Sequence, residues 1–141
     1  MFDFKFDWSK EVECGVEIID ALHREFFHIG RDIEQLLMNE CINVSDSQLL
    51  NIVCSLRDYA SYQIYTKEAL MKEYRYPKTY IQRKSLYTLQ ENILSIDINE
   101  LGRTPQIALT RLKEDLQTFL FNHILIESNE FGRYLNSCGV H

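Results

Sequence analysis

Prolines and glycines are scarce in this 141-residue sequence, numbering two and five, so few positions interrupt regular structure. Its four cysteines (Cys14, Cys41, Cys54 and Cys138) form no C-x-x-C pair, which excludes the common zinc and redox motifs and predicts free thiols. No apolar run approaches the roughly 18 to 20 residues of a membrane-spanning helix. The sequence also lacks an excess of positive charge. Its net charge of −6 argues against a nucleic-acid partner, since phosphate binding needs a basic surface. The N-terminal MFDFKFDWSK has no basic region followed by an apolar one, so no secretory signal is visible and a cytoplasmic location is expected.

Apolar residues recur at intervals of three and four throughout the chain, the spacing typical of amphipathic helices. The pattern predicts an all-α fold with helices over about 16–40, 47–74, 78–98 and 105–136, after an N-terminal arm (1–15) that Trp8 is expected to anchor. Short breaks near 41–46, 74–78 and 99–104 contain caps and helix breakers such as Ser45, Pro77 and Pro105. Because short connections favour antiparallel neighbours, residues 1–141 are predicted to form one up-down-up-down four-helix bundle.

Several polar residues occupy inward-facing positions near the middle of these helices. Gln63 and Lys67 lie one turn apart on the second helix, Gln82 is on the third and His123 on the fourth, while His23 faces inward on the first. Burying an unpaired amide or charge costs several kcal/mol, so these groups must meet one another, water or a ligand. The core of a four-helix bundle is also where this architecture holds metals and cofactors.

Three segments give the chain its resemblance to the hemerythrins, especially the bacterial single-domain type. VECGVEIIDALHREF is similar to the family's opening, with a Gly, an Ile-Asp pair and a His, and Trp8 precedes it. YASYQIYTKEALMKEYRYP is similar to the family's Tyr-x3-His-Phe-x-x-Glu-Glu-x-x-Met segment, which ends in Tyr-Pro. FLFNHILIESNEFGRYL resembles the last helix, with its His-Ile and closing Tyr. The resemblance covers nearly the whole chain and implies a bundle that binds oxygen at two irons, held by five His, one Glu and one Asp.

Carried over residue by residue, the resemblance leaves two of seven metal ligands in place. The His of the first and fourth helices are His23 and His123. The remaining ligand positions are substituted, and they correspond to Gln63, Lys67 (the bridging Glu), Gln82, Leu86 and Ser128 (the bridging Asp). Without both bridging carboxylates, and with a cation at one of their positions, nothing would hold two irons about 3.5 to 4 Å apart. Neither the family's di-iron site nor any other cofactor is therefore expected.

The first functional hypothesis is a degenerate hemerythrin-like bundle, not an enzyme, that acts in interaction, sensing or small-ligand binding with an unidentified protein or small ligand as partner. An alternative is a bacteriohemerythrin-like metal or oxygen-binding protein with a non-standard site, in which one zinc or iron uses His23 and His123. Glu127, Glu68 or a tyrosine would then complete the coordination. An enzyme with Lys67 as base or nucleophile is disfavoured, because no triad or cofactor loop accompanies it.

Two further expectations concern Lys67 and the aromatic residues. A buried Lys67 ammonium is expected to point toward Glu68 or Glu127, or toward the edge of the bundle. Its replacement by Met is then expected to be neutral or stabilising by about 1 kcal/mol or more, because desolvation roughly cancels the attraction of a partner. Tyr74, Tyr76 and Tyr80, together with the N-terminal aromatics, either form a partner surface or cap the ends of the bundle.

Overall fold

The computed structural model describes all 141 residues, which form helices and no strands. After a short 3₁₀ turn, η1 (Lys10–Val12), come α1 (Glu17–Met38), α2 (Asp46–Glu73) and α3 (Thr79–Leu94). The short α4 (Ile98–Arg103) leads into α5 (Pro105–Phe119), η2 (Leu120–Glu127) and α6 (Ser128–Ser137). The segment η2 has π-helical geometry and joins α5 to α6 without a break, so these three elements form one long rod.

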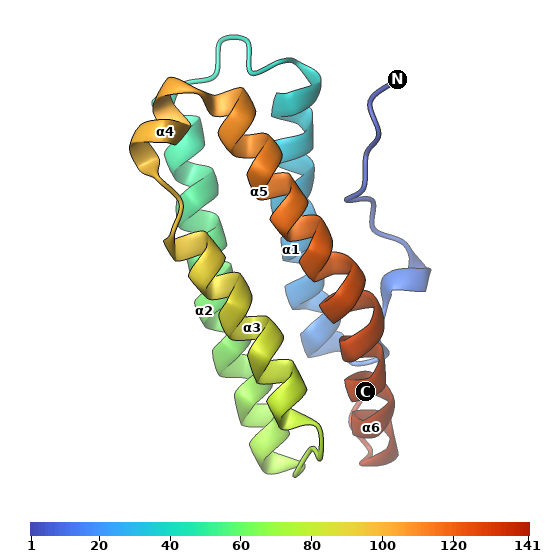
Figure 1. The fold of residues 1–141 in the computed structure, drawn as a ribbon. Helices are drawn as coiled ribbons and strands as arrows, with labels where there is room; N and C mark the ends of the chain where they lie inside the picture. The colour runs from blue at the N-terminus through green and yellow to red at the C-terminus, as the bar shows by residue number, and fades with distance from the viewer.

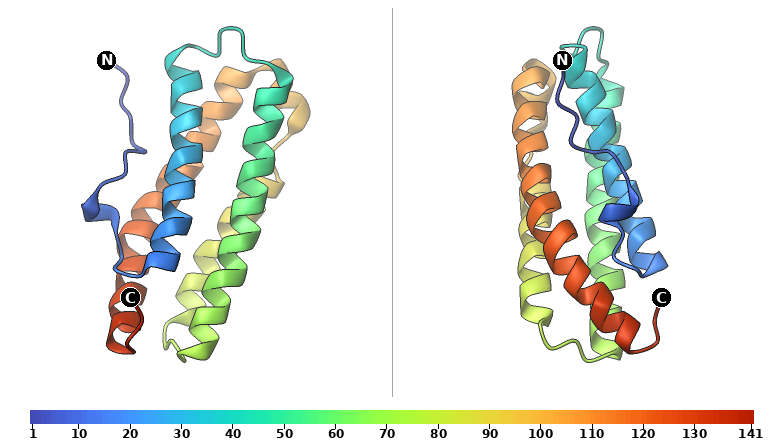
Figure 2. Two further views of the ribbon diagram at one scale, coloured as in Figure 1. Left: turned by 180° about the vertical axis from the view of Figure 1, so that it is seen from behind. Right: turned by 90° about the vertical axis from the view of Figure 1, so that its right-hand side faces the viewer.

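The long helices run antiparallel to their neighbours in sequence, as Figures 1 and 2 show. α1 and α2 are joined at one end of the bundle, α2 and α3 at the other, and α4 lies in the connection from α3 to α5. The N-terminal residues follow the outside of α1 (Figure 2). The predicted fold class, an all-α antiparallel bundle with an N-terminal arm, is confirmed.

Local capping explains where these helices begin and end. Ser45 starts α2 through a capping box, in which its hydroxyl accepts from the Gln48 amide at 3.1 Å and its own amide donates to the Gln48 side chain at 2.8 Å. The third helix ends at Leu94 and not near residue 98 as predicted. The Asp97 carboxylate accepts from the amides of Asn99 and Glu100, which begins the separate helix α4. The connection between α3 and α5 therefore contains two helix breaks, with α4 between them.

The N-terminal arm is fixed to the bundle by an aromatic ring, a carboxylate and a glycine. Phe6 is buried and packs edge-on against Phe26 and Phe27, whereas Trp8, the predicted anchor, is only partly buried. The fully buried Glu34 carboxylate accepts from the backbone amides of Lys5 and Phe6 at 2.6 and 2.9 Å. A Cβ at Gly30 would lie 2.5 Å from the Phe6 ring, so this glycine creates the space that the ring fills.

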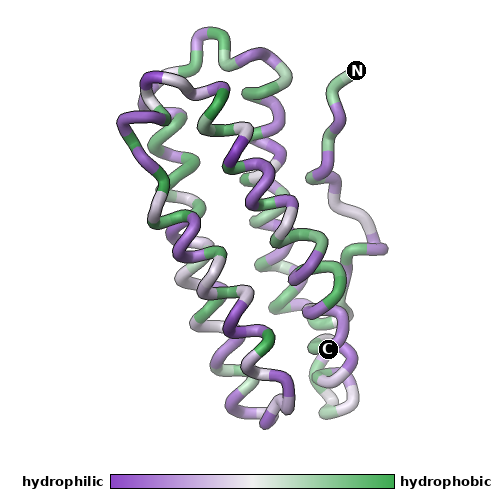
Figure 3. Tube along the Cα trace, in the orientation of Figure 1, coloured by the Kyte–Doolittle hydropathy of each residue, from purple (hydrophilic) through white to green (hydrophobic).

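The buried apolar residues form two clusters. The larger contains 25 residues and fills the half of the bundle near α4, whereas the smaller contains seven, including Ile19, Met71 and Phe131. The hydropathy trace in Figure 3 shows hydrophilic and hydrophobic residues interleaved along every long helix. No helix combines the length and the apolar character that crossing a membrane would require.

Between the two apolar clusters lies a set of buried polar side chains, here called the polar layer. On α2 the larger cluster ends at Ile64 and the smaller one begins at Met71, with Lys67 between them. The layer consists of side chains at most 1% exposed: His23, Gln63, Lys67, Gln82, His123 and Ser128.

The aromatic residues near the α2–α3 turn pack mostly against the end of the bundle. Tyr76 is buried, with its ring 4.6 Å from that of Phe131 and 5.1 Å from that of Tyr134. The Tyr134 hydroxyl donates to the Tyr74 carbonyl at 2.5 Å. Tyr80 differs, because 72% of it is exposed.

Candidate functional site

The Lys67 amine is the centre of the polar layer. Its Nζ lies 2.9 Å from His23 Nε2, 3.0 Å from Gln63 Oε1 and 2.8 Å from His123 Nε2. These partners come from α1, α2 and η2, so one ammonium with three N–H donors connects three elements. Lys67 is fully buried, and a protonated amine can satisfy all its donors here if both imidazoles offer a lone pair at Nε2.

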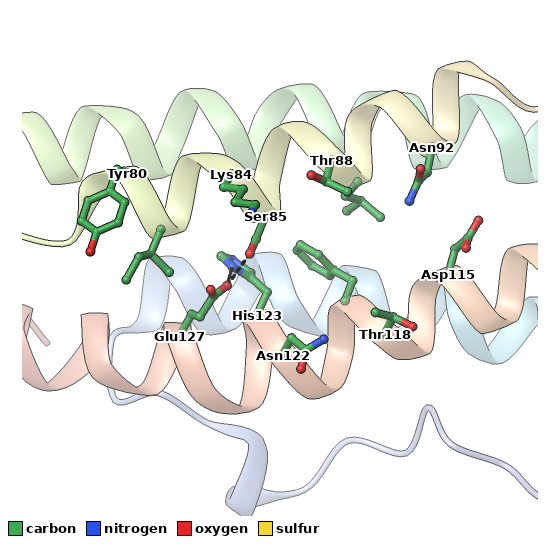
Figure 4. Close-up of a pocket in the computed structure, with 13 residues that line it drawn as sticks. Tyr80, Lys84, Ser85, Thr88, Asn92, Asp115, Thr118, Asn122, His123 and Glu127 are labelled. Atoms are coloured by element: carbon green, nitrogen blue, oxygen red, sulfur yellow. Dashed lines mark hydrogen bonds and ion pairs between the residues drawn. The ribbon is translucent and has the colours of Figure 1, made fainter.

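His123 connects this centre to a carboxylate nearer the surface. Its Nδ1 lies 2.9 Å from Glu127 Oε1, and the Ser85 hydroxyl donates to the same oxygen at 2.5 Å. Figure 4 shows Ser85, from α3, and His123 and Glu127, from η2, pointing toward one another. An ionised carboxylate only accepts hydrogen bonds, so it holds the His123 proton on Nδ1 and leaves Nε2 to accept from Lys67.

The π-helical segment explains why His123 and Ser128 both face the bundle interior. Five residues of an α-helix rotate the side chain by about 500°, which would place these two about 140° apart. In η2 the Ser128 amide donates to the His123 carbonyl, an i to i+5 bond that brings the two residues onto one face. The side-chain amide of Gln82 donates to the backbone carbonyl of Glu127 at 2.9 Å, which connects α3 to this segment. Single-turn π-segments within α-helices are frequent at functional sites.

Four buried polar atoms of the layer have no hydrogen-bond partner. They are His23 Nδ1, Gln63 Nε2, Gln82 Oε1 and Ser128 Oγ. All four belong to positions where the resemblance places metal ligands. A native core satisfies nearly all of its buried polar groups, so their concentration here marks unused hydrogen-bonding capacity in one layer.

Burial controls the protonation of the layer. Desolvation lowers the pKa of Lys67 from 10.5 to about 7, although the nearby Glu127 carboxylate acts in the opposite direction. Desolvation, reinforced by the Lys67 charge, holds the pKa of both His23 and His123 well below 6.5, so both imidazoles are neutral at pH 7. The pKa of Glu127 is raised, mainly because it is partly buried.

The structure brings together four of the residues singled out in the sequence, namely His23, Gln63, Lys67 and His123. Leu86 belongs to the larger apolar cluster and contributes no polar atom. The expectation for Lys67 was wrong, because its ammonium meets imidazoles and an amide instead of a carboxylate or the bundle edge. Glu68 lies near the surface, where it pairs with Arg83 at 3.1 Å.

Two further members of the hydrogen-bond network were not predicted as such. The Tyr59 hydroxyl donates to Gln63 Oε1 at 2.9 Å, and Ser85 supports Glu127. A signal for both was present, because Tyr59 precedes Gln63 by one turn and Ser85 follows Gln82 by three residues, spacings that share a helix face. The signal for the π-segment was the five-residue spacing of two inward-facing side chains.

A cavity of about 530 Å³ leads from the surface to His123 and Glu127. It runs between α3 and the α5–η2 rod, with Leu89 and Phe119 among its apolar lining residues. Polar side chains dominate the rest of its lining: Tyr80, Lys84, Ser85, Thr88, Asn92, Asp115, Thr118 and Asn122. Since His123 contacts Lys67 directly, this cavity ends one residue away from the buried amine.

Comparison with known proteins supports the resemblance to the hemerythrins. No protein-family model matches the chain. A bacteriohemerythrin of Clostridium acetobutylicum is 24% identical over 126 residues, which cover 89% of this chain and 98% of the relative. The chain is hemerythrin-like. Alignment over nearly the full length of both sequences supports the resemblance of this hemerythrin-like chain to the bacteriohemerythrins.

The residues of this hemerythrin-like bundle do not fit a di-iron centre. Nowhere in the chain do three or more His, Cys, Asp or Glu side chains converge as a metal site requires. The Nε2 lone pairs of His23 and His123, which a metal would need, both face the Lys67 amine within hydrogen-bonding distance. A protonated Lys67 would also repel a metal ion at that point. The polar layer is consistent with loss of the iron site.

Proposed function

We propose that this chain is a non-catalytic, cytoplasmic small-ligand-binding or sensing module that has exchanged the hemerythrin di-iron centre for a buried amine. The observation that carries the proposal is the position of Lys67 Nζ, within 2.9 Å of Nε2 of both His23 and His123. The amine takes up the ligand-donating atoms of these side chains, so oxygen chemistry on iron is not the activity proposed.

The cavity between α3 and the α5–η2 rod supports the small-ligand part of the proposal. Its volume of about 530 Å³ lies within the range of small-molecule sites, and it mixes apolar and polar lining groups. A ligand seated there would contact Glu127 and His123 and could alter the hydrogen bonds that both make. Occupancy would in that way be transmitted to Lys67 and the centre of the bundle.

Metal analysis tests the replacement of iron by the amine. Protein purified from iron-supplemented cells is expected to contain far less than one iron per chain and to lack the absorption bands of an oxo-bridged iron pair. The matched control restores all five substituted positions together (Gln63→His, Lys67→Glu, Gln82→His, Leu86→His and Ser128→Asp) and is expected to recover iron. Lys67→Glu alone is not expected to recover iron, because three histidine ligands and the aspartate are still missing.

Two irons per wild-type chain would overturn the proposal. One stoichiometric zinc or iron, lost in His23→Ala and in His123→Ala, would favour the alternative of a single-metal site instead.

Ligand binding is tested by recording backbone amide resonances while small polar molecules are added. A saturable ligand is expected to shift the amides of Ser85, Thr88 and Asn122, which line the cavity. The control variant Thr88→Phe fills the cavity from an exposed position and should abolish those shifts without unfolding the protein. Saturable shifts located elsewhere, and retained in Thr88→Phe, would contradict the cavity as the site.

A further inference from the structure

The cavity between α3 and the α5–η2 rod has a carboxylate toward each end. Asp115 lies at the end nearer α4, with Asn92 opposite, and Glu127 lies toward the other end, where Tyr80 is found (Figure 4). Residues 115 and 127 belong to one continuous rod, so their backbones are separated by at most about 18 Å. The cavity is therefore an elongated site with negative charge toward both ends.

Both carboxylates have unused capacity to bind a cation. Desolvation and the neighbouring Glu114 raise the pKa of the Asp115 carboxyl, and no cationic side chain acts in the opposite direction. Glu127 accepts hydrogen bonds from Ser85 and His123 through Oε1, while its Oε2 accepts none from the protein. Because 19% of the Glu127 side chain is exposed, Oε2 is the oxygen that remains open to the cavity.

Between the two carboxylates the cavity lining suits a hydrocarbon chain. Leu89 and Phe119 are buried and lie between the two ends in their positions along α3 and α5, with Thr88 and Thr118 beside them. Toward the Glu127 end, the Tyr80 ring is 72% exposed, and the face of a tyrosine ring attracts a cation. An apolar middle with cation-binding groups at both ends is thus the chemical character of this site.

We propose that this cavity binds a linear aliphatic molecule with a cationic nitrogen at each end, an inference that rests on the proposed function and names the class of its small ligand. One ammonium donates to Glu127 Oε2, the other donates to Asp115, and the methylene chain between them packs on Leu89 and Phe119. Allowing for the reach of both carboxylate side chains and for one hydrogen bond at each end, the two nitrogens must lie roughly 6 to 11 Å apart. Cadaverine and lysine both have this span.

Lys84 distinguishes the two sources of this chemistry, a simple diamine and a basic amino acid. Its side chain is exposed and lines the same cavity, next to Ser85 on α3 (Figure 4). A basic amino acid carries a carboxylate that attracts the Lys84 ammonium, whereas a diamine is only repelled by it. An anionic ligand is disfavoured, because two carboxylates face one ammonium in the cavity and the chain has a net charge of −6.

Calorimetric titration of the full-length protein at pH 7 and low salt tests the inference. The probes are cadaverine and lysine, each compared with the analogue that lacks one amine, pentylamine and norleucine. We expect one molecule of the doubly aminated probe per chain, bound roughly 3- to 5-fold more tightly than its analogue, as for an exposed ion pair. That advantage should disappear in Asp115→Asn, because the variant has lost the partner of the second nitrogen.

Glu114→Gln is the matched control for Asp115→Asn. It removes one negative charge from the adjacent exposed position on α5, but Glu114 does not line the cavity, so the advantage of the second amine should remain. Lys84→Met should weaken the binding of lysine and tighten that of cadaverine. The probe that binds wild type more tightly then identifies the source of the ligand.

The inference is overturned if neither doubly aminated probe binds saturably, or if Asp115→Asn and Glu114→Gln have equal effects, which would indicate attraction to the overall negative charge. Failure of the proposed function is distinguishable, since it would show as iron bound to the wild-type chain. Iron-free protein that binds an uncharged or anionic molecule at Ser85, Thr88 and Asn122, and neither probe, would retain the small-ligand function and remove only the doubly cationic ligand.

Discussion

At the scale of single residues, Lys67 reorganises the ligand set that the resemblance implies. The imidazole nitrogens of His23 and His123 lie within 2.9 Å of one amine instead of being available to separate irons. Glu127 orients His123 through Nδ1, in the way that a carboxylate orients a metal-bound histidine. The Nε2 of His123 is thereby directed at the Lys67 amine.

Replacement of Lys67 by Met is now expected to destabilise the protein. The sequence-based expectation assumed a carboxylate partner, whereas the structure shows two imidazole acceptors that would be left buried and unpaired. Each unpaired acceptor costs about 1–3 kcal/mol, partly offset by relief from burying the amine, so a net loss of about 2 kcal/mol or more is expected. Urea unfolding at pH 7 measures this change in the free energy of unfolding. The control is Lys84→Met, at an exposed position, for which the change should be near zero. A Lys67→Met protein as stable as wild type would contradict this balance.

At the scale of elements, the arm and α1 are matched to each other through Gly30. Glycine inside a helix usually costs stability relative to alanine, so Gly→Ala is ordinarily favourable by up to about 1 kcal/mol. At Gly30 the added Cβ would lie 2.5 Å from the Phe6 ring, far inside contact distance. The conformational advantage of alanine and the packing of the arm therefore conflict at this position.

Gly30→Ala is expected to displace Phe6 and loosen the arm. Hydrogen exchange should increase at the amides of Lys5 and Phe6, which donate to Glu34, and the free energy of unfolding should fall by roughly 1–3 kcal/mol. Gly102→Ala is the matched control, because its Cβ would meet nothing nearer than 4.0 Å and the change should be neutral or slightly stabilising. Equal effects from both substitutions would show that Phe6 does not depend on the space at Gly30.

At the scale of the whole molecule, a polar layer separates two apolar clusters. The larger cluster of 25 residues carries most of the hydrophobic stabilisation, and the smaller one of seven closes the other end. Since the layer is buried between them, its protonation is linked to folding of the bundle. The free energy of unfolding should therefore depend on pH in a way that these groups determine.

Stability is expected to increase with pH from about 7 to 9. The folded pKa of Lys67 is about 7 and the unfolded value is 10.5, so over this range the unfolded state binds more protons and the free energy of unfolding rises, by up to about 1.4 kcal/mol per pH unit. Above pH 9 the trend should weaken, because burial raises the pKa of Cys14 to about 12 and its unfolded thiol ionises first. Denaturant unfolding at several pH values across this range measures how the free energy of unfolding depends on pH. Between pH 7 and 9 this dependence should vanish in Lys67→Met.

Acid should destabilise the protein through the two buried histidines. Burial holds the pKa of His23 and His123 well below 6.5 in the folded protein. Below about pH 6.5 the unfolded state therefore binds protons that the folded state does not bind. The free energy of unfolding is expected to fall steadily between pH 6.5 and 5, also in Lys67→Met if it folds. A stability that does not change over this interval would mean that both imidazoles gain solvent or a partner on protonation.

The sequence by itself determined the helical class, the antiparallel bundle and the polar character of the layer. Spacings of three and four decide which residues share a helix face, and burial of that face follows from the hydrophobic effect. His23, Gln63, Lys67 and His123 could therefore be assigned to the interior one helix at a time. The split into α3 and α4 was within reach as well, since Asp97 is a common helix-capping residue, but the apolar Ile96 continued the pattern past it.

Only the tertiary structure decided which polar groups meet. Periodicity gives the direction of a side chain from its own helix, but distances between helices depend on their relative rotation and axial position, which packing of the whole core sets. The pairing of Lys67 with two imidazoles in place of a carboxylate is a result of that kind. The π-segment is another, because the extra residue in its turn is stabilised by contacts across the bundle, such as the Gln82 amide on the Glu127 carbonyl, that no local pattern contains.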